Sequence, residues 1–232
     1  MIFSVLIPVV QTDLALNLLD QIKHNTRPPD RIAIIDNSPK GIQLRKTNGS
    51  VIVFRPNPPW SFNKSLNYGR TLLPGSDLVS VLNDDLILNR HFFSVVEEGF
   101  NRGSIDMGVL CPNTYYKQEE ISKVLEQQRD NPIVERLSRR EGWAFTIRYS
   151  LWAQIPDVPE NLVTFFGDDW LQHWTNSLGM IWGKITNHFV FHYVGASVTS
   201  TGLRSTMEDE RVIFRRLLLE TTETNKRRAS SI

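Results

Sequence analysis

Residues 78–86 read Leu-Val-Ser-Val-Leu-Asn-Asp-Asp-Leu, a short apolar stretch that ends in two adjacent carboxylates. A segment that is apolar almost throughout predicts a strand at the buried centre of an α/β sheet. Ligands of such sheets bind just beyond the carboxyl ends of the strands. Asp84 and Asp85 are therefore well placed to hold a hard divalent cation, which could in turn hold phosphates.

Strand and helix patterns alternate around this segment. Repeated strand–helix units predict an α/β fold with a mostly parallel central sheet flanked by helices. In the first half we expect strands over 3–10, 31–35, 51–55 and 78–82, and helices over 14–23, 61–72 and 91–100. In the less regular second half we expect strands over 107–110, 143–148, 180–182 and 189–194, and helices over 118–130, 168–177 and 207–219.

Length and composition indicate an ordinary globular protein. The 232 residues suffice for one substantial core, and no repeat or linker marks a boundary, so we expect a single domain over 1–232. Within it, we expect a nucleotide-binding half over about 1–112, an acceptor half over about 113–220 and a basic tail over 221–232. The formal charge of +1 gives no sign of whole-protein attraction to nucleic acid.

The cellular setting follows from two further observations. The only cysteine, Cys111, follows an expected strand and cannot form an internal disulfide, which fits a packing role in a reducing compartment. The apolar N-terminus lacks the basic leader of a signal peptide and is too short to span a bilayer. We therefore expect a cytoplasmic protein without stable membrane insertion, whose basic tail is a frayed terminus or, less simply, a contact to a membrane or polyanion.

Several polar residues of the first half are candidate ligand contacts. Asp36 ends the second expected strand, where a carboxylate can bind a nucleoside, although Asp-Asn-Ser-Pro is also good turn chemistry. Asn63 and Asn67 lie one helical turn apart and share a face, which favours a common ligand. Lys64 and Arg70 could meet a phosphate or simply face solvent.

The second half adds acids, histidines and tryptophans. Asp168 and Asp169 open an expected helix after Gly167, where capping or general-base chemistry would explain them. His188 is interpreted as structural, whereas His192 precedes a turn at Gly195 and Ser197 that suits a metal or phosphate. Five of the six tryptophans lie between 143 and 182, which favours core packing over a sugar-binding cleft.

Taken in order, these segments resemble family 2 glycosyltransferases of the GT-A fold, over residues 2 to 220. The resemblance is carried by Ser4-Val5-Leu6-Ile7-Pro8, Ile34-Ile35-Asp36-Asn37-Ser38, Asn67-Tyr68-Gly69, Leu82-Asn83-Asp84-Asp85, Gly167-Asp168-Asp169, and His192 with Gly195 and Ser197.

The resemblance implies a role for each segment. The strand with Pro8 would open the nucleotide-binding half, Asp36 would contact the nucleoside, and the Asn67 stretch, with Asn63 one turn before it, would lie beside the base. The family's Asp-x-Asp motif falls on 83–85, with Asn at its first position.

Asp85 would then be the direct metal ligand, with Asp84 nearer the donor sugar or ribose and His192 near the metal and diphosphate. The Glu-Asp motif matches Asp168-Asp169, which implies Asp169 as the base, with Asp in place of Glu at 168.

The implied activity is an inverting, metal-dependent transfer of a sugar from a nucleotide-diphosphate-sugar to an acceptor hydroxyl. Asp169 would take the hydroxyl proton, and Mn²⁺ or Mg²⁺ would neutralise the departing diphosphate. The acceptor stays open among glycan, lipid and protein.

Three rival functions remain. Transfer to a hydroxymethylated DNA base would use Arg136, Arg139, Arg140 and the tail. A module that binds a nucleotide or sugar without catalysis, and a nucleotidyltransferase, are the others. The nucleotidyltransferase would usually need a Gly-rich basic loop that residues 9–13 do not provide.

Overall fold

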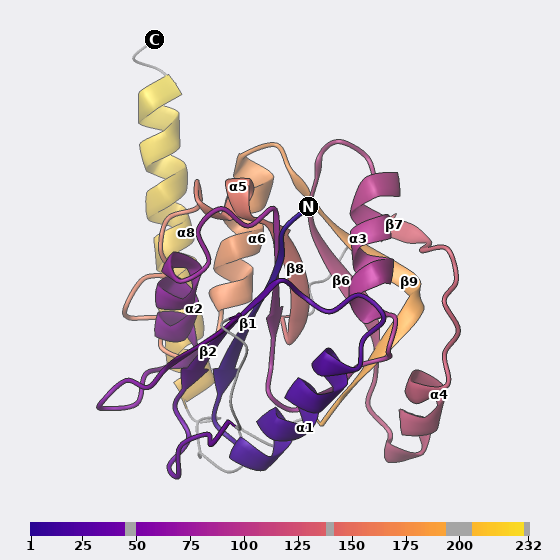
Figure 1. Ribbon diagram of the computed structural model, residues 1–232. Coiled ribbons are helices and arrows are strands. Elements are labelled where there is room, and N and C mark those ends of the chain that lie inside the picture. Colours follow the sequence, from indigo (N-terminus) through magenta and orange to yellow (C-terminus); the bar gives the residue numbers. More distant parts are fainter. Residues whose placement is uncertain (45–49, 138–141, 194–205, 230–232) are drawn as a thin grey trace.

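The computed structural model describes residues 1–44, 50–137, 142–193 and 206–229, with side chains described up to residue 220. A nine-stranded sheet forms its centre and helices cover both faces (Figure 1). The strands are β1 (Phe3–Val9), β2 (Arg31–Asp36), β3 (Val51–Phe54), β4 (Leu78–Leu82), β5 (Leu86–Ile87), β6 (Met107–Tyr115), β7 (Val134–Arg136), β8 (Ala144–Arg148) and β9 (Ile181–His192). The helices are α1 (Thr12–Lys23), α2 (Phe62–Thr71), α3 (Phe92–Arg102), the 3₁₀ turn η1 (Gln118–Glu120), α4 (Ile121–Leu125), α5 (Tyr149–Trp152), α6 (Gly167–Ser177) and α8 (Met207–Ala229).

The sheet has a parallel half and a mixed half. Its order is β3-β2-β1-β4-β8-β6-β9-β5, with β7 paired to β9. β1 to β4 are mutually parallel, as expected from their strand–helix alternation. β8 lies antiparallel between β4 and β6, and β5 and β7 run antiparallel to β9. The expectation of a mostly parallel sheet therefore holds for the first half, whereas the second half is mixed.

Burial of the central strands on both faces explains their apolar sequences. All residues of β1 and β4 are buried. Phe3, Val5 and Ile7 join the core beneath α1 and α3, whereas the intervening Leu6 packs with residues of α2, α5 and α6 on the other face. Because side chains alternate along a strand, each central strand supplies both cores. Cys111 is fully buried among them, which confirms its packing role.

Several sequence expectations were wrong in detail. The two strands expected over 180–182 and 189–194 are one strand, β9, which pairs with β6 and absorbs a register shift opposite Pro112 and Asn113. The helix expected over 118–130 is only η1 and α4. The short elements β5, β7 and α5 were not expected. Among the five clustered tryptophans, Trp152, Trp170 and Trp182 are at most 4% exposed and confirm core packing.

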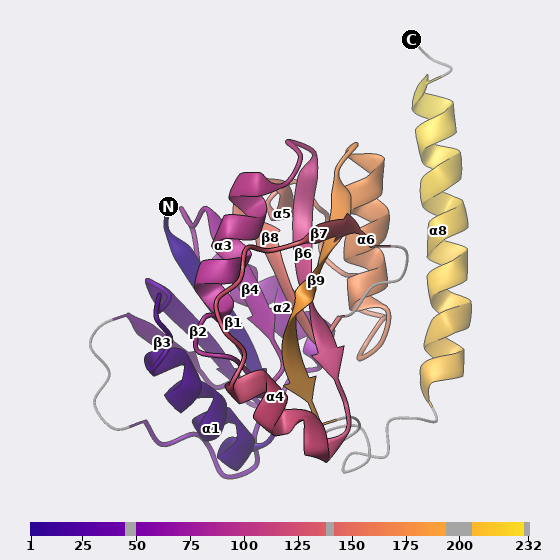
Figure 2. The ribbon, with the colours of Figure 1, turned by 90° about the vertical axis from the view of Figure 1, so that its right-hand side faces the viewer.

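The C-terminal helix α8 stands beside α6 and rises past the body of the domain (Figures 1 and 2). Its first turns contact the body through Phe214, in a cluster with Val158, Leu162 and Trp170. The helix continues to Ala229, through most of a stretch that was expected to be a frayed tail. Among the described residues, no helix has the length and apolar character needed to cross a membrane.

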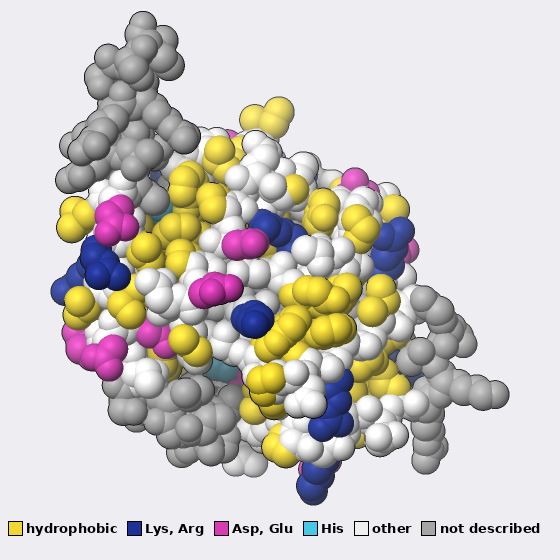
Figure 3. All heavy atoms as spheres, turned by 90° about the vertical axis from the view of Figure 1, so that its left-hand side faces the viewer, with side chains coloured by type: hydrophobic (Ala, Val, Ile, Leu, Met, Phe, Trp, Pro, Cys, Tyr) yellow, Lys and Arg dark blue, Asp and Glu magenta, His cyan; other side chains and the backbone are white. Residues whose placement is uncertain are grey.

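The face that includes α2 and β3 mixes hydrophobic and charged side chains (Figure 3). Ile52 and Val53 of β3 are about two-fifths exposed, at 41% and 43%, because β3 is the outermost strand on that side. Behind them, Phe54, Trp60 and Tyr68 form a triangle of ring contacts with centroids 4.5 to 5.1 Å apart.

His188 is a buried histidine of β9, which agrees with the prediction that it is a structural residue. It is 2% exposed, its ring lies 6.3 Å from that of Phe92, and its Nε2 has no hydrogen-bond partner in the described structure. Burial, together with the smaller effect of the nearby His91, lowers the pKa of His188 to about 4. The folded protein therefore keeps this imidazole neutral.

We predict that His188→Gln reduces the loss of stability in acid. The unfolded chain binds the proton near the ordinary pKa of 6.5, so stability is complete above that value and falls as the pH drops toward 4. Between pH 7.5 and pH 5 this linkage removes about 2 kcal/mol from the wild type. Urea denaturation at both pH values measures it. The exposed His24→Gln is the control, and equal losses in wild type and His188→Gln would contradict the prediction.

Candidate active site

Asp84 fastens the end of β1 to the end of β4. It is 3% exposed, and its Oδ2 accepts hydrogen bonds of 2.7 Å from the backbone N–H groups of Val10 and Gln11. Burial raises the pKa of Asp84 to about 6. The hydrogen bonds from Gln11 and Val10 oppose this rise and the charge of Asp85 adds to it. Asp84 therefore fixes the turn between β1 and α1, where the two parallel strands present their carboxyl ends.

Asp85 reaches the opposite way, toward β9. Its Oδ1 lies 3.1 Å from Nε2 of His192, the last residue of that strand, and its backbone oxygen accepts the N–H of Tyr193. Both side chains are nearly buried, at 3% and 9% exposed. The structure thus brings together the two residues that the sequence proposed as metal ligands.

The Asp85–His192 pair fits a divalent cation. Neither Asp85 Oδ1 nor His192 Nδ1 makes a hydrogen bond to the described residues, although both atoms are buried. The 3.1 Å between Asp85 Oδ1 and His192 Nε2, the ring nitrogen that faces it, is close to the separation of neighbouring ligands on an octahedral ion with bonds of about 2.1 Å. Among the described residues no group of three or more His, Cys, Asp or Glu side chains gathers for a metal. The described residues would therefore supply two ligands, Asp85 and His192, to such a cation.

Trp143 holds the His192 ring in place. Its ring stacks on the imidazole with centroids 5.2 Å apart and an interplanar angle of 12°. Its Nε1 donates to Thr114 Oγ1 at 3.0 Å, and its backbone oxygen accepts the N–H of Asn83. Trp143 thereby ties the ends of β4, β6 and β9 together, while the half-exposed Tyr116 approaches its edge.

The second acidic pair approaches the same place through Gly142. Asp168 and Asp169 lie in the first turn of α6, half-buried, where the helix dipole favours negative charge. A Cβ on Gly142 would collide with Asp168 Oδ2, so this carboxylate lies directly against the residue before Trp143. Gly142 and Trp143 therefore join the α6 acids to the Asp85–His192 pair.

Asp36 accepts hydrogen bonds within the turn that follows β2. It is 2% exposed, and its Oδ1 accepts from the backbone N–H and the hydroxyl of Ser38, at 3.0 and 2.5 Å. Its Oδ2 accepts the N–H of Ile42 at 2.8 Å. The structure shows these turn contacts, and the nucleoside contact by Asp36 stays a prediction.

Asn63 and Asn67 bind a loop of the protein itself. Nδ2 and Oδ1 of Asn67 pair with the backbone oxygen and N–H of Val158, both at 2.9 Å. Asn63 Nδ2 donates to the backbone oxygens of Leu162 and Phe165. The two residues do share a face, as expected, but this face holds the 158–165 loop. A donor contact by either residue stays a prediction.

The remaining predicted contacts of the first half are also structural. Arg70 donates to the backbone oxygens of Trp152 and Ile155 and pairs with Asp157, so it holds the start of the same loop. Lys64 lies over the Trp60 ring, 5.0 Å from its centroid.

Pro8 is buried in β1, two residues beyond the last pair that β1 makes with β4, where a residue without an N–H is tolerated. Gly195, Ser197, Arg139 and Arg140 lie outside the described residues.

Trp143 and Gly142 were not singled out by sequence reasoning, although Trp143 was noted among the clustered tryptophans. A tryptophan that opens a strand is usually a core residue, and nothing local reveals its contact with a histidine forty-nine residues later. Glu210, which binds the 158–166 loop, was also missed. Its neighbours Glu208 and Asp209 make it resemble one more acid in a helical first turn.

No protein-family model and no curated protein sequence matches the chain. Among solved structures, GalNAc-T7 with UDP, GalNAc and Mn²⁺ superposes with a TM-score of 0.64 at 11% identity, covering 82% of this chain and 43% of that one. S. aureus TarS 1–349, alone and in complex with UDP, superposes with a TM-score of 0.59 at 11% identity, covering 84% and 61%.

The fold is that of GT-A glycosyltransferases. At these identities the comparisons speak for the fold alone. This chain spans about two-fifths to three-fifths of the length of those chains.

We predict that Asn67→Ala destabilises the protein by about 1–3 kcal/mol, because it leaves a buried N–H and C=O of Val158 without partners. Asn101→Ala is the matched control, since Asn101 is an exposed asparagine of α3. Guanidinium denaturation of both variants measures the difference. Equal stabilities would show that Asn67 does not anchor the loop.

Proposed function

We propose that the protein is a metal-dependent glycosyltransferase of family 2 that moves a sugar from a nucleotide-diphosphate-sugar to an acceptor hydroxyl. One observation carries the proposal. The Asp85–His192 pair and the Asp168–Asp169 helix start are joined through Gly142 and Trp143, at the carboxyl end of β4. A pair that could hold a cation, placed beside a candidate base, suits glycosyl transfer from a diphosphate.

The donor side of the proposal rests on Asp85 and His192. These side chains would hold Mn²⁺ or Mg²⁺, and the imidazole favours Mn²⁺. When bound, the cation supplies charge stabilisation to the diphosphate leaving group. Asp84 shapes the β1–α1 turn against which the donor would lie, and Trp143 keeps the imidazole oriented. UDP is the first nucleotide to test, because two of the structural neighbours were crystallised with it.

The acceptor side rests on α6. Asp169, by its position in the motif, would take the proton of the acceptor hydroxyl as the oxygen attacks the anomeric carbon. The carbon–oxygen bond to the diphosphate breaks at the same time, with inversion. Asp168, which lies against Gly142, would hold the first turn of α6 beside the donor.

The acceptor class and a cytoplasmic location remain open parts of the proposal. A glycan, lipid or protein hydroxyl fits this chemistry equally well. A hydroxymethylated DNA base would need a basic groove; Arg136 is exposed on β7, whereas Arg139 and Arg140 lie outside the described residues.

We predict that UDP raises the melting temperature of the wild type only with Mn²⁺, and that Asp85→Asn abolishes this shift. At 100 times the dissociation constant, binding adds about 2.7 kcal/mol, which thermal denaturation detects easily. Asp130→Asn, an exposed acid, is the control and should respond as the wild type does. A shift without metal in both proteins would contradict the metal site. No shift with UDP, GDP, dTDP or CDP would contradict the donor site and favour a module of another kind.

We predict that Asp169→Asn slows sugar transfer by about 10²–10⁴-fold while the Mn²⁺-dependent UDP shift persists, because a lost general base affects chemistry and not donor binding. The measurement is UDP release from a panel of UDP-sugars. Asp168→Asn is the matched neighbour, with a smaller expected loss. The reverse order of losses would assign the base to Asp168, and unchanged rates in both variants would contradict a base on α6.

A further inference from the structure

The segment that leads into α6 is held from two sides. It runs from Val158 to Phe166, immediately before the helix that carries Asp168 and Asp169. On one side, Asn63 and Asn67 of α2 bind its backbone. On the other side, α8 contacts it from the far end of the chain. The start of α6 is thus placed by elements about a hundred residues before it and forty after it.

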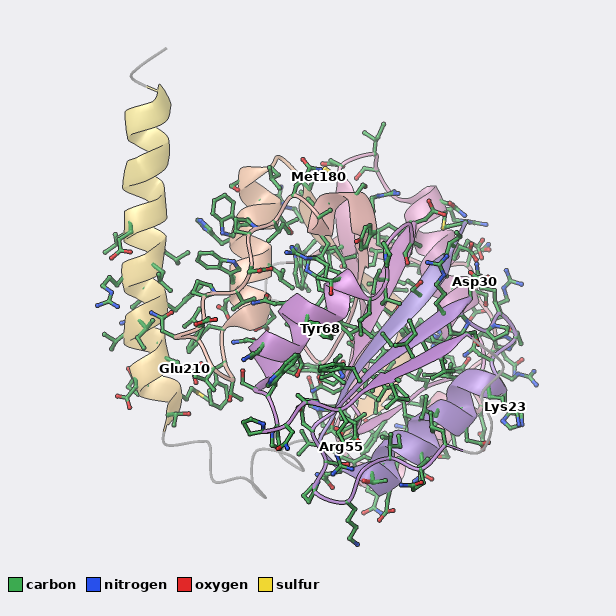
Figure 4. The ribbon with its side chains drawn as sticks, turned by 60° about the vertical axis from the view of Figure 1, so that its left-hand side comes forward. Lys23, Asp30, Arg55, Tyr68, Met180 and Glu210 are labelled. Carbon is green, nitrogen blue, oxygen red and sulfur yellow. The ribbon has the colours of Figure 1, made fainter. Side chains whose placement is uncertain are left out.

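Glu210 makes the α8 contact. It lies in the first turn of α8 and is 4% exposed, on the part of the helix nearest the body (Figure 4). Its carboxylate accepts the backbone N–H of Thr164, at 3.1 and 3.2 Å, and that of Phe165 at 2.9 Å. These donors and the positive end of α8 stabilise a charge that burial would otherwise disfavour.

The hydrogen bonds of Phe165 show that the backbone just before α6 is fixed from both sides. Its N–H is bound by Glu210 and its backbone oxygen by Asn63. The next residue, Phe166, has a left-handed backbone with φ of 62°, which is rare for a phenylalanine and persists where surroundings impose it. The Phe166 ring stacks on Phe214, one turn after Glu210, with centroids 5.3 Å apart and an interplanar angle of 17°.

We propose that Glu210 is a positioning residue for the α6 carboxylates. It fixes the peptides of Thr164 and Phe165, and Phe214 supports the left-handed backbone of Phe166. Together these contacts fix the orientation of the first turn of α6. The inference rests on the proposed function, since it assigns the purpose of this anchor to the base on α6. A displacement of the base by about 1 Å costs on the order of 10²-fold in rate.

The test compares Glu210→Gln with Glu208→Gln. The first keeps the size of the side chain but removes its charge and turns one acceptor into a donor that faces an N–H. The second changes a 67%-exposed acid on the same helix, which pairs with Arg211 among the described residues. Three quantities are measured: hydrogen exchange of the Thr164 and Phe165 amides, UDP affinity with Mn²⁺, and kcat with KM for the UDP-sugar.

We expect Glu210→Gln to exchange the two amides about tenfold faster and to lose about 10²-fold in kcat. UDP affinity and donor KM stay within about threefold of the wild type, because the Asp85–His192 side is untouched. Glu208→Gln should match the wild type throughout. If Glu210→Gln does not fold, Phe214→Leu removes the stacking on Phe166 and is expected to separate kcat from UDP affinity in the same way.

Unchanged amide exchange or unchanged kcat would overturn the inference. So would a parallel fall of kcat and UDP affinity, which would mean that Glu210 serves the fold as a whole. A wild type that binds none of UDP, GDP, dTDP and CDP would instead contradict the proposed function. The exchange measurement would still decide whether Glu210 fixes this segment.

Discussion

The candidate site depends on two adjacent buried carboxylates at the end of β4. In the turn that follows β4, the two carboxylates repel each other and lose hydration. Each therefore needs its own partner to offset the cost of burying its charge. Asp84 finds it in two N–H groups at the end of β1, whereas Asp85 Oδ1 lies 3.1 Å from His192 Nε2 at the end of β9 and makes no hydrogen bond to the described residues. Because the two residues reach in different directions, they join the parallel half of the sheet to the mixed half.

A second set of polar contacts solves a related problem in the acceptor half. Loops carry backbone groups that need partners when they are buried. Asn63, Asn67, Arg70 and Glu210 supply these partners for residues 152–165, mostly through side chain to backbone bonds. An asparagine offers a donor and an acceptor at once, which suits the paired N–H and C=O of Val158. Polar residues on α2 that suggest a ligand are therefore explained by a loop ninety residues away.

The sequence predicted what depends on local pattern. The four parallel strands, the helices between them and the acids at the start of α6 all follow from periodicity and burial. The meeting of Asp85 with His192 was expected from a family resemblance, and the structure bears out their proximity. Asp36, Asn63 and Asn67 were harder to interpret, because turn formation, loop binding and ligand binding all favour the same residue types.

Long-range strand pairing accounts for the remaining differences between the structure expected from the sequence and the observed fold. The placement of β8 between β4 and β6 depends on partners far along the chain, and no local signal reveals it. The continuity of β9 has the same origin, since its polar middle, residues 184–188, pairs with β6 and β7 at Lys184 and Ile185 and then spans the register shift against β6. Glu210 illustrates the limit most clearly. Three consecutive acids open α8, and only tertiary structure shows which one is buried.

The site therefore has two walls that are held independently. One comprises Asp84, Asp85, His192 and Trp143, and the ends of β1, β4, β6 and β9 fix it. The other is the first turn of α6, fixed by α2 and α8. The described contacts join them through Gly142, where the absence of a Cβ lets Asp168 approach the strand that carries Trp143. Under the proposed function, donor binding and proton removal would be altered separately by substitutions away from Gly142, because contacts without shared partners contribute almost additively. A glycosyltransferase of the proposed kind could then change its acceptor side while the donor side keeps its geometry.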